Sequence, residues 1–194
     1  MKNNPLQKIS VIGLAVCGLA LAVSIFVPIW AIYLQAPQYP EGLAMFLWSG
    51  KITGDYEIIN GLNHYIGMKT IHQEDFREFR ILPYALGFFA LLCFAAAFLN
   101  KKFWLYFTAA LFLLFGTAFM VDFYLWEYDY GHNLDPHAAI VVPGMSYQPP
   151  LIGFKQLLNF SAYSYPDIGG IIMIGVAIIL IILAIIELRK PKTV

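Results

Sequence analysis

The sequence predicts an all-α integral membrane protein: four transmembrane helices, both termini cytoplasmic, and an extracytoplasmic cap formed by two long loops. Of the 194 residues, 60% are hydrophobic and 12% are charged, whereas a soluble domain has roughly 45–50% apolar and about 25% charged residues. The mean hydropathy is +0.68. Four apolar runs approach or exceed the roughly 20 residues that cross about 30 Å of hydrocarbon. Because backbone groups in lipid must bond within their own segment, these runs are expected to be helices.

The predicted spans cover residues 9–34, 81–99, 103–126 and 168–188 of a single membrane domain, 1–194. The short turn at residues 100–102 makes the second and third spans an antiparallel hairpin. The two loops that would form the cap are residues 35–80 and 127–167. Asp122 is the only acid well inside an apolar run, and it is either a functional group or a side chain that reaches the interface.

Basic residues give the orientation. They stand just before the first span, between the second and third spans, and just after the fourth span: Lys2, Lys8, Lys101, Lys102, Arg189, Lys190 and Lys192. The positive-inside rule assigns this face to the cytoplasm. The net charge is zero, which gives no indication of a nucleic-acid partner.

All four histidines fall in the two outer loops. The first loop carries His64, Met68 and His72 in the stretch "GLNHYIGMKTIHQEDF", which we expect to be helical. Residues four apart on a helix are neighbours, so Met68 could share an ion with either histidine. The two histidines are about 12 Å apart along the axis, so a complete site needs the second loop.

The second loop contributes His132, His137 and Met145. Thioether sulfur is soft and suits Cu(I), and imidazole suits copper as well as zinc and iron. Structural zinc sites usually contain cysteine thiolate, and both cysteines here lie inside apolar runs. The ligand set therefore favours copper, as Cu(I). The alternative is that the histidines lie at the interface and the methionines fill gaps by chance.

Signals for catalysis are absent from the sequence. It has no Walker loop, no GxGxxG after a strand and no GxSxG, which are the signatures of nucleotide binding and of serine hydrolases. We expect that this chain is not an enzyme.

Three phrases, "APQYPEGLAMFLW", "INGLNHYIGMKTIH" and "DPHAAIVVPGMSYQPPLIG", together with the four spans, carry a resemblance over nearly the whole chain. The chain is similar to the tetraspan membrane proteins encoded beside atypical (clade II) nitrous oxide reductases, the NosB-type proteins. This resemblance implies a multi-pass protein of the bacterial inner membrane that supports a periplasmic multicopper enzyme.

The resulting hypothesis is an accessory inner-membrane protein that binds copper on its periplasmic face. It would aid delivery to, or maturation of, a periplasmic respiratory copper enzyme such as nitrous oxide reductase. Its partners would be the lipid bilayer, that enzyme or a copper chaperone, and membrane partner subunits. The ligands would be His64, Met68, His72, His132, His137 and Met145.

Two alternatives remain open. One is a metal-free docking or structural subunit of a membrane respiratory or assembly complex, because Tyr and Trp are enriched at interfaces. Its contact residues would be Tyr39, Trp48, Tyr128, Tyr130, Tyr147 and Tyr163. The other is a redox-active membrane subunit that handles quinol or haem.

Overall fold

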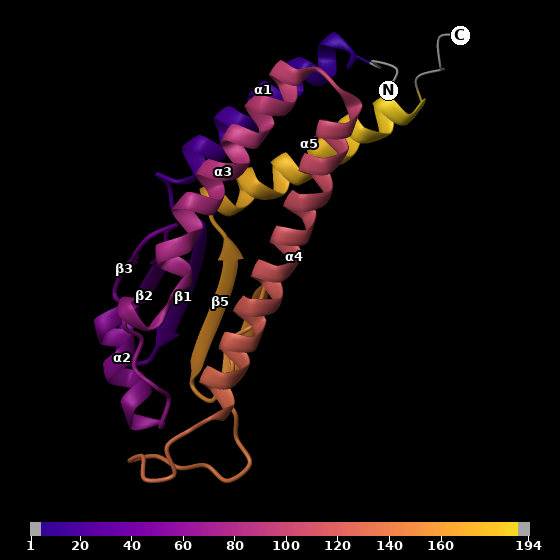
Figure 1. Ribbon diagram of the computed structural model, residues 1–194. Coiled ribbons are helices and arrows are strands. Elements are labelled where there is room, and N and C mark those ends of the chain that lie inside the picture. The colour runs from indigo at the N-terminus through magenta and orange to yellow at the C-terminus, as the bar shows by residue number, and fades with distance from the viewer. Residues whose placement is uncertain (1–4, 190–194) are drawn as a thin grey trace.

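The computed structural model describes residues 5–189 and has a mixed α/β fold, so the all-α prediction is wrong. Figure 1 shows an elongated molecule with a helical bundle at one end and a β-sheet at the other. The helices are α1 (Lys8–Ser24), α2 (Tyr56–Tyr65), α3 (Glu78–Leu99), α4 (Lys102–His132) and α5 (Ile168–Arg189), with a 3-10 turn at Gln73–Asp75. The strands are β1 (Trp30–Ala36), β2 (Tyr39–Leu47), β3 (Ile52–Gly54), β4 (Gly153–Leu157) and β5 (Phe160–Pro166).

The five strands form one antiparallel sheet in the order β3-β2-β1-β5-β4. The central strand β1 pairs with β2, where Trp30 lies opposite Leu47, and with β5, where Trp30 lies opposite Pro166. The sheet therefore joins segments from both predicted loops. The cap is an ordered β-structure instead of two loops.

The first predicted span, residues 9–34, is also wrong. Helix α1 has 17 residues and ends at Ser24, and the apolar residues after Pro28 form β1. Proline disfavours helical conformation in the residue before it, and aromatic and β-branched residues favour strands. Trp30 and Ile32 are buried in the sheet, so their apolar character reflects a protein core and not contact with lipid.

Within residues 5–189, three helices, not four, are long and apolar enough to cross a membrane: α3, α4 and α5. They overlap the predicted segments 81–99, 103–126 and 168–188. Helix α4 has 31 residues, or about 46 Å at 1.5 Å per residue, which exceeds the roughly 30 Å of hydrocarbon. Its first 20 residues are enough for a span, and residues 122–132 run on beside the sheet (Figure 1).

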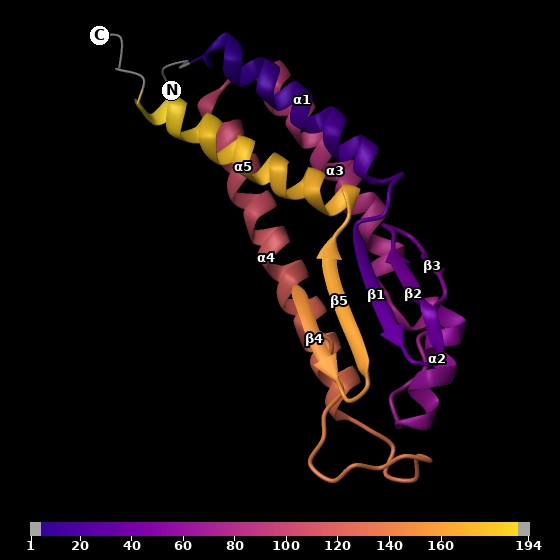
Figure 2. The same cartoon turned by 180° about the vertical axis from the view of Figure 1, so that it is seen from behind.

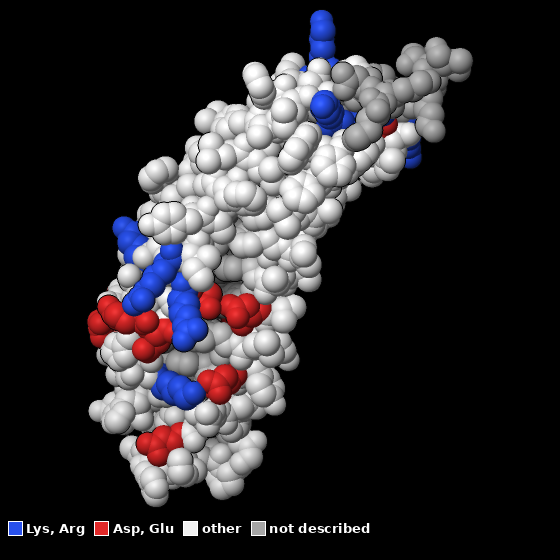
Figure 3. Space-filling view, viewed as in Figure 1, with Lys and Arg blue, Asp and Glu red and all other residues white. Residues whose placement is uncertain are grey.

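We call α1, α3, α5 and residues 102–121 the bundle half. The strands, α2, residues 122–132 and the segments that connect them are the sheet half. Figure 3 shows the charged side chains of one face gathered over the sheet half and at the far end of the bundle, with an uncharged band between them. Such a band is what contact with lipid tails requires, because a charge is costly there.

In the bundle half, α1 packs against both α3 and α5. The core contains Leu14, Leu86 and Leu180, all fully buried, together with the thiols Cys17 and Cys93. Both cysteines are free and buried. They contribute to packing as small apolar groups.

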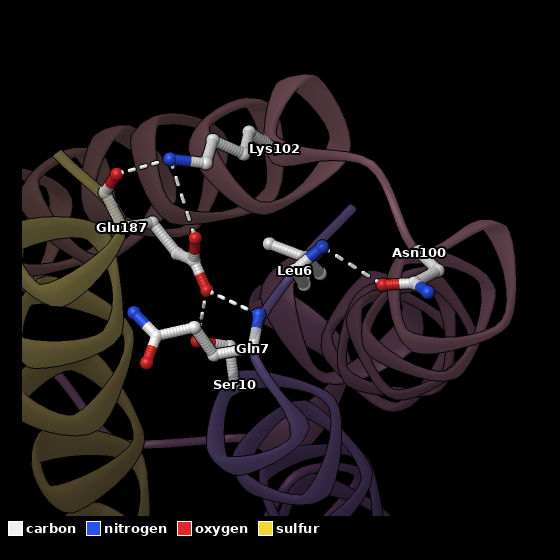
Figure 4. A network of polar contacts seen from close by, with 6 residues as sticks. All are labelled: Leu6, Gln7, Ser10, Asn100, Lys102 and Glu187. Atoms are coloured by element: carbon white, nitrogen blue, oxygen red, sulfur yellow. Dashed lines mark hydrogen bonds and ion pairs between the residues drawn. The ribbon is translucent and has the colours of Figure 1, made fainter. Parts of the chain in front are cut away.

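A buried polar network ties the far end of the bundle together (Figure 4). The Glu187 side chain of α5 is fully buried and accepts hydrogen bonds from the Gln7 backbone N–H and the Ser10 hydroxyl, each at 2.7 Å. Lys102 Nζ lies 3.4 Å from the same carboxylate and donates to the Glu187 carbonyl oxygen. Asn100 Oδ1 accepts the Leu6 backbone N–H at 2.9 Å.

This network brings the start of α1, the α3–α4 turn and the end of α5 to one end of the molecule. Lys8, Lys101, Lys102 and Arg189 of the predicted basic face belong to these elements. The other members, Lys2, Lys190 and Lys192, lie outside the described residues.

The sheet half has its own core, between one face of the sheet, α2 and the last third of α4. Trp30 packs edge to face on Phe123 of α4 with ring centroids 5.3 Å apart, and its Nε1 donates to Ser164 Oγ at 2.7 Å. Ile59 of α2 and Tyr130 of α4 are buried in the same cluster. The two cores, one in each half, are thus built by different residues.

A substitution at Gly131 tests how closely the chain after α4 packs on this helix. A Cβ at Gly131 would lie 2.2 Å from the backbone N and Cα of Gln148, and the Tyr147 N–H donates to the Gly131 carbonyl at 2.8 Å. We expect Gly131→Ala to lower the free energy of unfolding by about 1–3 kcal/mol, as overpacking does. Thermal unfolding in detergent measures this.

Gly116 on the same helix is the matched control, because a Cβ there meets nothing within 4 Å. We expect Gly116→Ala to leave the unfolding temperature unchanged or slightly raised, since alanine favours helix. Equal effects of the two substitutions would contradict the close packing at Gly131.

Candidate functional site

The first group of predicted copper ligands does not share one helix. Helix α2 ends at Tyr65, so the helix predicted across residues 61–76 is wrong from residue 66 onward. Gly67 has φ +80°, a left-handed conformation that ends the helix, and the Met68 N–H bonds back to the Asn63 carbonyl at 3.0 Å. Glycine commonly takes this position after a helix, which is the sequence signal that the prediction overlooked.

The three side chains of this group have different environments. His64 is exposed in the last turn of α2, and its ring meets the ring edge of Tyr65. Met68 is buried, 8% exposed, in the core of the sheet half. His72 is exposed just before the 3-10 turn. The Met68 thioether is therefore an apolar core group in this structure.

The second group lies at and beyond the end of α4. His132 stacks on Tyr128 with ring centroids 4.0 Å apart, and its Nδ1 lies 2.9 Å from the Tyr128 carbonyl. His137 is exposed, and its backbone N–H donates to Asp135 Oδ1 at 2.8 Å. Met145 is half-buried against the core of the sheet half.

The two segments do meet, through their backbones. The Asp135 N–H donates to the Gly67 carbonyl and the Ile140 N–H to the Tyr65 carbonyl, both at 2.8 Å. Among residues 5–189, no group of three or more His, Cys, Asp or Glu side chains is arranged to hold a metal ion. Copper binding by the six side chains stays a prediction.

The aromatic residues of the docking hypothesis divide into two sets. Tyr130 and Tyr147 are only 5% and 2% exposed, so they belong to the core and cannot contact a partner. Tyr163 lies on the sheet face that points away from α4, against Phe154 at a centroid distance of 4.9 Å. Tyr33 lies opposite Tyr163 on β1 and is 42% exposed.

A cavity of about 610 Å³ lies where the two halves meet. We call it the junction cavity. Its apolar wall combines side chains of β1, β2, β3, the 69–79 segment, α3 and α4. These are Ile29, Trp30, Met45, Leu47, Trp48, Ile52, Ile71, Phe76, Phe79, Leu82, Phe119, Phe123, Leu125, Trp126 and Tyr130.

The charged residues of the cavity are four acids and one lysine: Asp75, Glu78, Asp122, Asp129 and Lys69. Lys69 Nζ pairs with Asp129 at 2.7 Å, and this hydrogen bond lowers the pKa of the Asp129 carboxyl. Both side chains are more than half exposed, so the pair adds little to stability. Apart from Glu78, which is half-buried, these charged residues are exposed, whereas Trp30, Met45 and Phe123 of the wall are buried.

One sign of this cavity is visible in the sequence. Asp122 stands inside an apolar run, one helical turn from Phe119 and Trp126, and all three line the cavity. The remaining wall comes from segments that are distant in the chain. Only the folded sheet brings them together.

A second unusual group, Glu127, lies on the part of α4 beyond the span. It is fully buried, and neither carboxyl oxygen has a hydrogen-bond partner among the residues that the structure describes. Burial raises the pKa of Glu127 to about 8, partly offset by the charge of Lys155 on β4. Gly131 lies one turn after Glu127 on α4, and its carbonyl accepts the backbone N–H of Tyr147 from the segment after the helix. The Tyr147 hydroxyl is also buried, without a partner among the described residues.

Glu127→Gln tests the effect of this burial on stability. The pKa of Glu127 is about 8 in the folded chain against 4.5 ordinarily, so between these values the folded chain holds a proton that the unfolded chain has lost. Stability should then fall as pH rises, by at most about 1.4 kcal/mol per pH unit, until the loss is complete above the folded pKa. Glutamine stays neutral, so we expect the variant to lose this pH dependence and to be more stable than the parent at pH 8.

The measurement is denaturant unfolding in detergent at several pH values between 5 and 8. Glu57→Gln on α2 is the control, because Glu57 is exposed, and it should follow the parent. Parallel stability curves for Glu127→Gln and the parent would show that Glu127 does not titrate in this range.

Comparisons with known proteins give no further assignment. The sequence matches no protein-family model and no curated protein, and the structure matches no solved structure. The resemblance to NosB-type proteins stays a prediction.

Proposed function

We propose that this protein is a membrane-anchored binding protein that holds a small amphipathic molecule in the junction cavity. The observation that carries the proposal is the cavity itself, at about 610 Å³. Ligand sites in proteins typically enclose about 300–1,000 Å³ and combine mostly apolar walls with a few polar groups. The junction cavity has this size and this composition.

The wall of the cavity is held in place by its own contacts. Trp30 is fixed by its hydrogen bond to Ser164 and its edge-to-face contact with Phe123. Trp126 stacks on Tyr130 with centroids 4.9 Å apart and packs against Phe76 at 5.1 Å. A pre-formed wall lowers the entropy lost on binding, which favours a rigid apolar ligand body.

The position of the cavity supports access from a membrane. Leu82 and Phe119, on two of the helices that are long and apolar enough to span, line it from the bundle half. The basic residues at the opposite end of the bundle favour a cytoplasmic location for that end. In this proposal the cavity opens at the extracytoplasmic boundary of the bilayer, where an amphipathic molecule concentrates.

Tryptophan fluorescence tests binding. Three of the four tryptophans, Trp30, Trp48 and Trp126, line the cavity. The fourth, Trp104, lies near the opposite end of α4, so Trp104→Phe leaves only reporters at the cavity. We expect a brominated C12 alcohol, titrated into this variant in nanodiscs, to quench the remaining fluorescence saturably.

Thr70→Phe in the same background should weaken this quenching about tenfold or more, because Thr70 lines the cavity and a ring would fill part of it. Thr117→Phe is the matched control, since Thr117 is exposed on α4 in the bundle half and lies away from the cavity. Linear quenching without saturation, or equal quenching in both variants, would overturn the proposed function.

Copper support remains a second candidate, and one observation favours it. His64 and His137 are exposed; His64 precedes Tyr65 and His137 lies two residues after Asp135, and Tyr65 and Asp135 both take part in the backbone hydrogen bonds that join the two predicted ligand segments. Two imidazoles from separate segments are thus placed on adjacent stretches of chain. Imidazole and thioether ligands suit Cu(I), and the accessory role in respiratory copper-enzyme maturation would follow from such a site.

Cu(I) titration of the purified protein against a chromophoric chelator tests this candidate. We expect the double variant His64→Ala with His137→Ala to compete at least about tenfold more weakly for Cu(I). The reason is that it lacks two of the imidazole ligands of the proposed His/Met site. Asn159→Ala, an exposed position in the β4–β5 turn, should change nothing. If the parent protein does not compete with the chelator at all, the copper role is excluded.

A further inference from the structure

We infer that the ligand of the junction cavity is an amphipathic cation, with its apolar body inside and its positive group at the mouth. This inference rests on the proposed function and adds the chemical class of the ligand. It follows from three features of the cavity: where its charges stand, which of them are already paired, and what its walls are made of.

The charges stand at the mouth and are mostly negative. Asp75, Asp122 and Asp129 are exposed and Glu78 is half-buried, whereas the deeper wall, including Ile52 and Met45, is buried and apolar. A molecule that fills the cavity therefore meets carboxylates at one end and hydrocarbon at the other. An uncharged or anionic end would leave the carboxylates without a compensating charge.

Pairing leaves the acids in excess. Lys69 is the only basic residue in the wall, and it pairs with Asp129 at 2.7 Å. Within the described residues, Asp75, Glu78 and Asp122 have no ion pair within 4.0 Å. Arg77 and Arg80 are close in sequence but do not line the cavity. Three carboxylates are thus free to attract a cation.

Aromatic rings give a second point of attraction. Lys51 Nζ already lies 4.7 Å from the ring centroid of Trp48, a wall residue. A cation over an indole ring gains about 0.5–1 kcal/mol at an exposed site and more when desolvated. Trp126 and Phe76 offer further ring surface in the same wall.

Competition between probes of equal chain length tests the class of ligand. Dodecyltrimethylammonium, dodecanol and dodecyl sulfate are added separately to the Trp104→Phe protein in nanodiscs of neutral lipid, with the brominated C12 alcohol already bound. We expect the cation to displace the alcohol at roughly fivefold lower concentration than dodecanol, and the sulfate to be weakest, since contacts of exposed charges contribute modestly. Added salt should reduce the preference.

Two double variants separate a local from a general charge effect. Glu78→Gln with Asp122→Asn should bring the ratio of the cation affinity to the dodecanol affinity down to about one. Glu41→Gln with Glu57→Gln removes the same charge at exposed positions outside the wall and should preserve the preference.

The outcomes distinguish the two proposals. If the alcohol binds saturably and Thr70→Phe weakens its binding, the proposed function stands. If, in that case, the cation is not preferred or the sulfate is preferred, this inference is overturned. Loss of the cation preference in both double variants would also overturn it. Absence of saturable alcohol binding would overturn both.

Discussion

The pairing of β1 with β5 is the constraint on which the rest of the structure depends. It joins residues 30–35 to residues 161–166, the segments by which α1 and α5 connect the bundle to the sheet (Figure 2). The hydrogen bonds continue past the strands, because the Asp167 and Gly169 N–H groups donate to the carbonyls of Ile29 and Pro28. Two of the four chain connections between the halves are therefore fixed at one place. This is why the sheet keeps a definite position against the end of the bundle.

The junction cavity follows from that arrangement. Each half packs its own core, and the sheet half is joined to the bundle half along α4, at the start of α3, and at the two connections next to β1 and β5. Leu82 belongs to the bundle core and Trp30 to the core of the sheet half, yet both line the cavity. Atoms of the cavity wall that face the open space make fewer van der Waals contacts than atoms in a packed core. A molecule bound in the cavity would supply these contacts. Rigid walls with unfilled space between them are the physical basis of the proposed binding role.

Local hydropathy predicted part of this fold and missed the rest for identifiable reasons. The apolar runs at 81–99, 103–126 and 168–188 are helices because apolar character persists over a helix long enough for a span. The run at 9–34 joins a helix to a buried strand, and a short apolar strand cannot be told from helix by periodicity. Pro28 was the only local sign of the change. One partner of β1, strand β2, follows it closely in the chain, but the other partner, β5, is more than a hundred residues away. No local pattern could therefore reveal the complete sheet or the cavity. The meeting of the two histidine-bearing segments was foreseeable, but the burial of Met68 depends on the turn at Gly67.

Two buried glutamates show how differently the ends of α4 are stabilised. Glu187 meets the Lys102 end of α4. Its carboxylate accepts hydrogen bonds from Gln7 and Ser10 and forms an ion pair with Lys102, so its burial is compensated and ties helices together. Glu127, near the other end, has no such donor, and burial without a hydrogen bond is unfavourable for a carboxylate. Its neighbours in sequence include Trp126 and, one turn away, Tyr130, which both line the junction cavity. The end of α4 that buries an uncompensated carboxyl is thus the end that carries the cavity wall. A ligand that binds only the folded chain stabilises it, and one that packs against Trp126 and Tyr130 would add contacts at this end of the helix, beside the unfavourable burial of Glu127.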